Sequence, residues 1–248
     1  MVREAPRVLI VDDDVDITCN VHDILTDLGY VADVAHDGLE ALQLIQRRSY
    51  AVALVDLKMP GMDGATLYGH IKSVRPETVT ILITGFTREP AVQQAIDAGT
   101  WKVLSKPVDI EVLLGLLRQA LSEPLVILVD DDSEFCESLW QLLREQGYRV
   151  AVAHREDEGV AKAREAEFQI ALADWRLGDG DGREVLAAVR ARNPGARTML
   201  ITGHRSEASE SSRLCADGVV DAVSYKPIDP SELLSTLEQF LHFERRFR

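Results

Sequence analysis

The chain has 248 residues, of which 46% are hydrophobic and 27% are charged, a composition typical of a folded soluble protein and not of a disordered one. Its 41 Asp and Glu against 27 Lys and Arg give a formal net charge of -14, which disfavours direct binding to nucleic acid or to an anionic membrane. The three cysteines form no metal-binding or redox pattern. The sequence has no apolar run like that of a leader peptide and none long enough to span a membrane. These features predict a cytoplasmic protein.

From the N-terminus onward, short apolar runs alternate with amphipathic stretches whose apolar residues recur at helical spacing. The apolar runs predict buried strands at Arg7–Val11, Val31–Ala35, Ala51–Val55, Val79–Ile83 and Lys102–Leu104. The amphipathic stretches predict helices near Val15–Leu28, Gly38–Arg47, Ala65–Val74, Glu89–Ala98 and Asp109–Leu121. Strict alternation of strand and helix predicts an α/β fold with a five-stranded parallel sheet and helices on both faces.

The rest of the chain repeats this pattern. The segment VLIVDDD at 8–14 returns as VILVDDD at 126–132, and further segments match with the same offset. A helical pattern ends near Ser122, and Pro124, which cannot continue a helix, precedes a new strand. We therefore expect two homologous (βα)5 domains at 1–122 and 126–248, joined by a short linker at 123–125.

Polar residues stand where the predicted strands of the first half end. They are Asp12 and Asp13 after the first strand, Asp56 after the third, Thr84 after the fourth and Lys106 after the fifth. The carboxyl ends of parallel strands share one edge of the sheet, so these side chains should meet there. Three crowded carboxylates repel one another and need a cation, and oxygen ligands that leave positions open suit Mg²⁺.

The second half holds the same residue types at the same places: Asp130, Asp131, Asp174, Thr202 and Lys226. Taken singly, such an Asp is often a helix cap, and Thr or Lys-Pro often ends a strand or forms a turn. If these residues were only caps and turns, the same five residue types would have to occur by chance at the same strand ends in both halves. A carboxylate beside a metal can instead attack a phosphoryl group, with Lys balancing the charge and Thr donating a hydrogen bond.

This set of residues and spacings resembles the receiver (CheY-like) domain of two-component response regulators, which has a flavodoxin-like fold. The resemblance covers nearly the whole chain, twice. It implies that Asp56 and Asp174 accept phosphoryl groups, that Lys106 and Lys226 contact them, and that Thr84 and Thr202 supply the switch hydroxyls. It also implies cis peptides before Pro107 and Pro227. Finally, it implies one Mg²⁺ per domain, held by Asp12, Asp13, Asp56 and the Lys58 backbone carbonyl, and by Asp130, Asp131, Asp174 and the Arg176 backbone carbonyl.

Two positions depart from the family's pattern. The family usually has an aromatic residue three positions before the Lys, where this chain has Val103 and Val223, which leaves open how the switch is read out. The first half has PGMDG at 60–64, whereas the second has GDGDG at 178–182, which removes a proline and adds an acid. We therefore expect phosphate turnover at the second site to differ from that at the first.

The resemblance implies a phosphorelay response regulator with two receiver domains and no output domain, which signals through phosphorylation-dependent protein binding. A histidine kinase or histidine phosphotransfer protein would donate the phosphoryl group, and two copies could pair through the face of the last helix. The chain would not be an enzyme beyond catalysing its own phosphorylation and dephosphorylation. Alternatives are a phosphate sink or relay, or a receiver fragment of a larger hybrid kinase or cyclase.

Two functions of another class fit less well. A haloacid dehalogenase-like phosphatase usually has a second Asp two residues after the nucleophile, where this chain has Lys58 and Arg176. A dinucleotide-binding oxidoreductase would need a GxGxxG turn after the first strand, and neither half has one.

Overall fold

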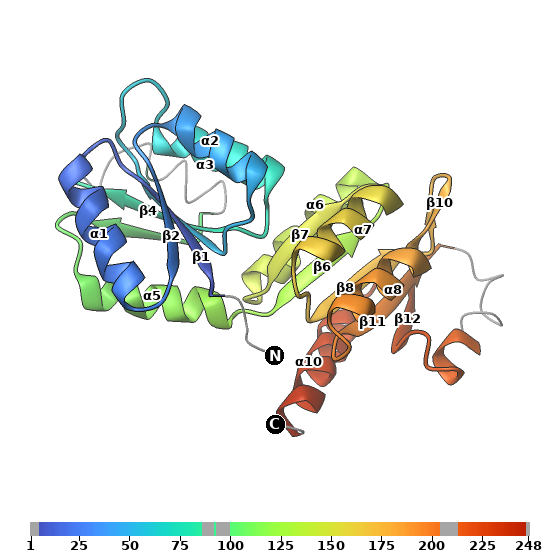
Figure 1. The fold of residues 1–248 in the computed structure, drawn as a ribbon. Helices are drawn as coiled ribbons and strands as arrows, with labels where there is room; N and C mark the ends of the chain where they lie inside the picture. The colour runs from blue at the N-terminus through green and yellow to red at the C-terminus, as the bar shows by residue number, and fades with distance from the viewer. Residues whose placement is uncertain (1–4, 86–91, 93–99, 204–212, 247–248) are drawn as a thin grey trace. The chain divides into compact units, whose positions relative to one another are not determined.

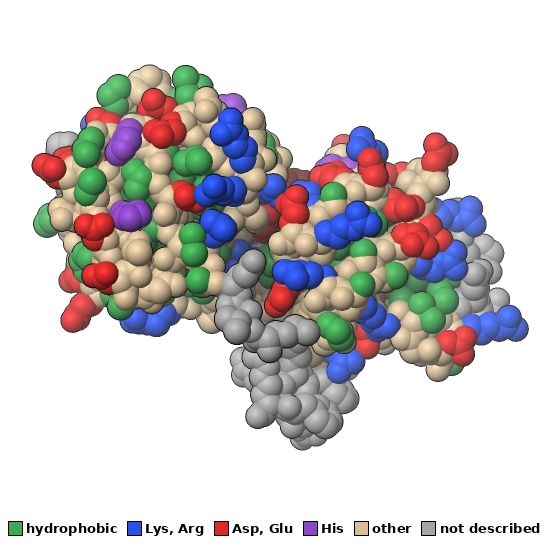
Figure 2. Space-filling model, in the orientation of Figure 1, with side chains coloured by type: hydrophobic (Ala, Val, Ile, Leu, Met, Phe, Trp, Pro, Cys, Tyr) green, Lys and Arg blue, Asp and Glu red, His purple; other side chains and the backbone are tan. Residues whose placement is uncertain are grey.

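The computed structural model describes residues 5–85, 92, 100–203 and 213–246, and the chain divides into two compact units (Figure 1). The first unit is Met1–Glu123 and the second is Pro124–Arg248. Among the described residues, no helix is both long and apolar enough to cross a membrane. Acidic side chains are interspersed with basic and apolar ones on the visible face of each unit (Figure 2), so neither visible face is a continuous basic surface.

The first unit follows the predicted order of elements. They are β1 (Arg7–Val11), α1 (Val15–Asp27), β2 (Val31–Ala35), α2 (Gly38–Arg47), β3 (Val52–Asp56), α3 (Gly64–Val74), β4 (Val79–Thr84), β5 (Lys102–Ser105) and α5 (Ile110–Ser122). Each predicted strand and helix that the structure describes is confirmed to within one residue at either end. The helix predicted near Glu89–Ala98 falls outside the described residues, apart from position 92.

The strands of the first unit form one parallel sheet in the order β2-β1-β3-β4-β5. Apolar side chains of α1 and α5, such as Leu25 and Leu117, pack with one face of the sheet. Side chains of α2 and α3, such as Ile45 and Ile71, pack with the other, as the ribbon shows (Figure 1). The predicted α/β fold with helices on both faces is therefore confirmed.

Helix caps in the first unit are supplied by residues other than the candidate site carboxylates. Asp14 caps α1 by accepting from the backbone N–H groups of Asp16 and Ile17. Asp63 caps α3, and Asp109 caps α5. Each cap satisfies N–H groups that the first helical turn cannot pair. The acidic residues at the strand ends are therefore not needed as the caps of these helices.

The second unit repeats the architecture. Its elements are β6 (Leu125–Val129), α6 (Ser133–Glu145), β7 (Arg149–Ala153), α7 (Glu156–Glu165), β8 (Ile170–Asp174), β9 (Arg176–Leu177), β10 (Gly180–Asp181), α8 (Gly182–Arg192), β11 (Arg197–Thr202), β12 (Ala222–Tyr225) and α10 (Pro230–Arg246). The main sheet has the order β7-β6-β8-β11-β12, and all of its strand pairs are parallel.

A small antiparallel hairpin, β9–β10, distinguishes the second unit and was not predicted. Gly178 adopts a left-handed φ of 61° in its turn, which glycine accepts without steric cost. The Glu156 carboxylate at the start of α7 accepts from the backbone N–H of Asp181 at 2.7 Å and so holds the hairpin against that helix. The matching residues 58–63 of the first unit form no strand.

Candidate functional site

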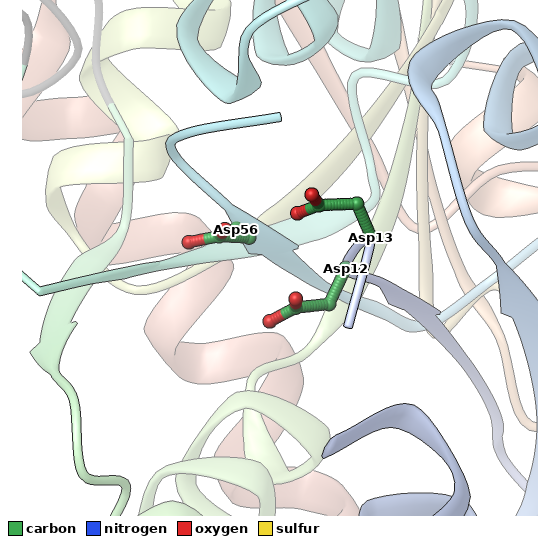
Figure 3. A group of neighbouring side chains, drawn as sticks. All are labelled: Asp12, Asp13 and Asp56. Carbon is green, nitrogen blue, oxygen red and sulfur yellow. The ribbon is translucent and has the colours of Figure 1, made fainter. Parts of the chain in front are cut away.

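Three carboxylates of the first unit meet at the carboxyl edge of its sheet. Strands β1 and β3 are neighbours, so Asp12 and Asp13 just after β1 lie beside Asp56 at the end of β3 (Figure 3). One carboxylate oxygen of each residue lies within 4.8 Å of the others. Asp12 and Asp56 are buried, with 2% and 5% of their surface exposed, whereas Asp13 is exposed. The group is thus open to solvent on one side.

Lys106 forms ion pairs with two of these carboxylates. Its Nζ lies 2.8 Å from Asp12 Oδ2 and 3.2 Å from Asp56 Oδ2. Burial, together with the charge of Asp12, raises the pKa of Asp56 although Lys106 opposes the shift. Burial alone would lower the pKa of Lys106, but the two carboxylates outweigh it and raise that pKa. Lys106 therefore stays a cation that partly neutralises the cluster.

The remaining predicted residues of the first site lie at neighbouring strand ends. Thr84 is the last residue of β4 and is 1% exposed. Its backbone carbonyl accepts from the Lys106 N–H at 2.8 Å, and the Lys106–Pro107 peptide is cis, as predicted. Gly64 lets α3 begin close to β3, because a Cβ there would overlap the backbone carbonyl oxygen of Asp56. The structure thus brings the five predicted strand-end residues of the first unit to one edge of the sheet.

The second unit brings its equivalent residues together in the same way. Carboxylate oxygens of Asp130, Asp131 and Asp174 lie within 4.8 Å of one another, and Lys226 Nζ lies 2.6 Å from both Asp130 Oδ2 and Asp174 Oδ2. Burial raises the pKa of the fully buried Asp130 although Lys226 opposes the shift. Thr202 is the last residue of β11 and is buried, and the Lys226–Pro227 peptide is cis.

Three details of the second site were missed at the sequence level. The ring of Phe135, in the first turn of α6, lies against Lys226 Nζ, which is 4.5 Å from the ring centroid. The backbone N–H of Arg176 donates to Asp174 Oδ1 at 3.1 Å. The third missed detail is the β9–β10 hairpin, which carries Arg176. A Gly-Asp-Gly turn could have signalled the hairpin, but no sequence pattern places a ring from one element over a lysine from another.

The two valines at the usual aromatic position are partly buried and pack against the apolar cores of their units. Trp101, which lies nearby in sequence, packs on the other face of the sheet from Val103, and its Nε1–H donates to Glu123 Oε1 at 2.8 Å. Trp101 therefore packs against the apolar core of the first unit and is tied to Glu123 by a hydrogen bond.

Comparisons with known proteins agree with this geometry. The family model described as "Response regulator receiver domain" matches residues 8–118 and 126–238. A response regulator receiver protein of Anaeromyxobacter sp. (strain Fw109-5) is 34% identical over 239 residues, which are 96% of each chain. The acid tolerance regulatory protein ActR of Sinorhizobium medicae is 33% identical over 114 residues, 46% of this chain and 58% of that protein.

Among solved structures, a CheY-like response regulator receiver domain protein from Methanospirillum hungatei JF-1 is 31% identical with a TM-score of 0.47, over 51% of this chain and all of that one. The assignment to a family rests on two findings. The family model matches twice and together covers most of the sequence, and one relative is aligned along 96% of its length. The chain belongs to the response regulator receiver family and is a two-component response regulator with two receiver domains.

Proposed function

We propose that each receiver domain accepts a phosphoryl group on one aspartate, Asp56 in the first and Asp174 in the second. The observation that carries the proposal is the same local arrangement in both units. A buried acceptor carboxylate lies beside two further carboxylates, and a lysine ammonium contacts it directly. A structural role for any one of these residues would not require the full arrangement to occur twice.

The proposed reaction is nucleophilic attack by a carboxylate oxygen on phosphorus. A bond forms between an Asp56 oxygen and phosphorus as the bond to the donor's leaving group breaks, and the product is an acyl phosphate. The Lys106 ammonium, which already contacts Asp56, balances the charge on the phosphoryl oxygens. The Thr84 hydroxyl donates to one of those oxygens. Asp174, Lys226 and Thr202 have the same roles in the second domain.

We also propose one Mg²⁺ per domain. Three carboxylates with oxygens within 4.8 Å, one residue of each three being exposed, fit a hard divalent cation that keeps some of its water. The ligands would be Asp12, Asp13, Asp56 and the Lys58 carbonyl in the first domain, and Asp130, Asp131, Asp174 and the Arg176 carbonyl in the second. When bound, the ion neutralises negative charge on the acceptor carboxylate and on the phosphoryl group.

The partners follow from this chemistry. A histidine kinase or histidine phosphotransfer protein in the cytoplasm would donate the phosphoryl group, and the phosphorylated chain would bind a downstream protein, or a second copy of itself. Each domain would also catalyse its own phosphorylation from a small donor and the later hydrolysis. The hairpin beside Asp174 makes the second site different from the first. We therefore keep a second candidate, in which one site drains phosphate and the other carries the signal.

Intact-mass analysis after incubation with Mg²⁺ and acetyl phosphate tests the acceptor assignment. The wild type should gain two labile adducts, Asp56→Asn and Asp174→Asn should each gain one, and the double variant none. Asp27→Asn, which removes an exposed carboxylate from α1, should match the wild type. Adducts that persist in the double variant would overturn the assignment. Unequal decay rates in the two single variants would support the candidate with a sink.

A further inference from the structure

We propose that Phe135 is a positioning residue that holds the Lys226 ammonium over the second acceptor site and makes this site bind a phosphoryl group more tightly than the first. The proposal deepens the function proposed above and rests on Asp174 being an acceptor. Phe135 lies in the first turn of α6, away from Asp174 in sequence and next to the acidic loop that follows β6. The equivalent residue of the first domain, Ile17, has no aromatic ring.

The contacts of Lys226 carry the proposal. Its Nζ lies 2.6 Å from Asp130 Oδ2, 2.6 Å from Asp174 Oδ2 and 4.5 Å from the centroid of the Phe135 ring, over its face. The negative face of an aromatic ring attracts a cation at such a distance, and more strongly where water is partly excluded. The Lys226 side chain is 24% exposed, so the contact is partly shielded from water.

The ring itself is held in place. Phe135 is partly buried and packs against the apolar core beneath α6, together with residues such as Ile228 and Leu233. The next residue, Cys136, is 2% exposed and anchors the same turn of the helix. A lysine side chain is flexible and pays conformational entropy to stay in one place. A fixed ring reduces that cost because it restricts the ammonium to the region above Asp174.

The first unit provides a natural comparison. Ile17 occupies the position equivalent to Phe135 in the repeat, and it packs into the core without offering a ring. Lys106 contacts Asp12 and Asp56 at 2.8 and 3.2 Å. In the proposed reaction the lysine must turn from its carboxylates toward phosphoryl oxygens. Lys226 keeps the ring as a partner during that change, whereas the equivalent position of the first unit holds the aliphatic Ile17.

Beryllofluoride with Mg²⁺, a phosphoryl mimic, measures the effect in the full chain. Affinity at the second site is followed by ¹⁹F NMR in the Asp56→Asn background, where only that site binds. Phe135→Leu should weaken binding about fivefold, whereas Phe135→Tyr, which keeps the ring, should stay within about twofold of the parent. The reverse exchange, Ile17→Phe in the Asp174→Asn background, should strengthen binding at the first site. Equal affinities for Phe135→Leu and its parent, or a Tyr variant as weak as the Leu variant, would overturn the proposal.

A second measurement is independent of metal and phosphoryl binding. In the free protein the Lys226 ε-methylene NMR signal, assigned with Lys226→Arg, should be shifted by the ring current of Phe135. This shift should vanish in Phe135→Leu and remain in Phe135→Tyr. An unshifted signal in the wild type would refute the contact.

Loss of beryllofluoride binding at Asp174 in the parent protein would instead contradict the proposed acceptor role, and the NMR shift would still decide whether Phe135 holds the lysine. Backbone spectra that match the parent's exclude misfolding as the cause of a loss.

Discussion

Asp221 offers a sharp test of what stabilises the second receiver domain. Its carboxylate accepts from Arg190 Nη2 at 2.6 Å, from Arg197 Nη1 at 2.9 Å, and from the Thr198 backbone N–H at 2.8 Å and hydroxyl at 3.1 Å. Only 18% of the Asp221 side chain is exposed. These bonds tie the residue just before β12 to β11 and α8, at the end of the sheet opposite the phosphoryl site.

The cost of Asp221→Ala can be worked from these contacts. A hydrogen bond to a charged group contributes about 1.5–3 kcal/mol, and losing one partner of a buried ion pair costs about 3–5 kcal/mol. The two guanidinium groups are 27% and 32% exposed, so water can replace part of what they lose. We therefore expect a loss of about 3 kcal/mol in the free energy of unfolding of the second domain.

Hydrogen exchange of the full chain, read by mass spectrometry, is the suitable assay because two domains need not unfold in one step. At pH 7, exchange from β11 and β12 should accelerate in Asp221→Ala, while the first domain stays unchanged. Asp217→Ala removes an exposed carboxylate four residues earlier and should change stability by less than about 0.5 kcal/mol. If the second domain is as stable in Asp221→Ala as in Asp217→Ala, the reasoning is refuted.

The effect of Asp221 should also depend on pH. Burial opposes ionisation of this carboxyl, but the bonds from Thr198, Arg197 and Arg190 outweigh burial and lower its pKa below the ordinary 3.8. A carboxylate with a lowered pKa in the folded state stabilises the fold fully above its unfolded pKa, and this contribution is lost as the pH falls through the folded value. The stability difference between wild type and Asp221→Ala should therefore be full at pH 7 and shrink below about pH 4. An equal difference at pH 7 and pH 3 would contradict this origin.

Three further predictions concern the sites. Gly182→Ala should cost about 3 kcal/mol in stability by thermal unfolding, because its Cβ would overlap the acceptor's backbone carbonyl, whereas Gly69→Ala, with open space around it, should not destabilise the fold. Burial, together with the charge of the neighbouring carboxylate, raises the pKa of Cys136 to about 12, so a maleimide should label the exposed Cys19 far faster, as peptide mapping can show. Lys106→Met should raise the Mg²⁺ affinity of the first site about tenfold by calorimetry, because a cation paired with two carboxylates is removed; an unchanged affinity would contradict the proposed ligands.

The sequence was sufficient to predict the parallel sheets, because alternating apolar runs and amphipathic stretches leave few other arrangements. Asp56 and Thr84 turned out to be the last residues of their strands rather than the first after them, a difference of one position. The common edge of a parallel sheet then explains why residues so far apart in sequence meet.

Other features depend on contacts between elements that no local pattern records. The position of Phe135 over Lys226 requires the packing of α6 beside the end of β12. The hairpin β9–β10 depends on Glu156, from a different helix, accepting from Asp181. Asp221 is similarly unremarkable in sequence, and only the fold brings two arginines to it. These tertiary contacts account for the differences between two domains that share one pattern.

The central claim, phosphoryl transfer to Asp56 and Asp174, can be tested directly in the unmodified chain. After incubation with Mg²⁺ and acetyl phosphate, borohydride reduces an aspartyl phosphate to homoserine, and peptide mapping then identifies the modified residue. We expect homoserine at positions 56 and 174, and only when both Mg²⁺ and the phosphodonor are present. Homoserine at other aspartates, or at none while the protein remains folded, would contradict the account.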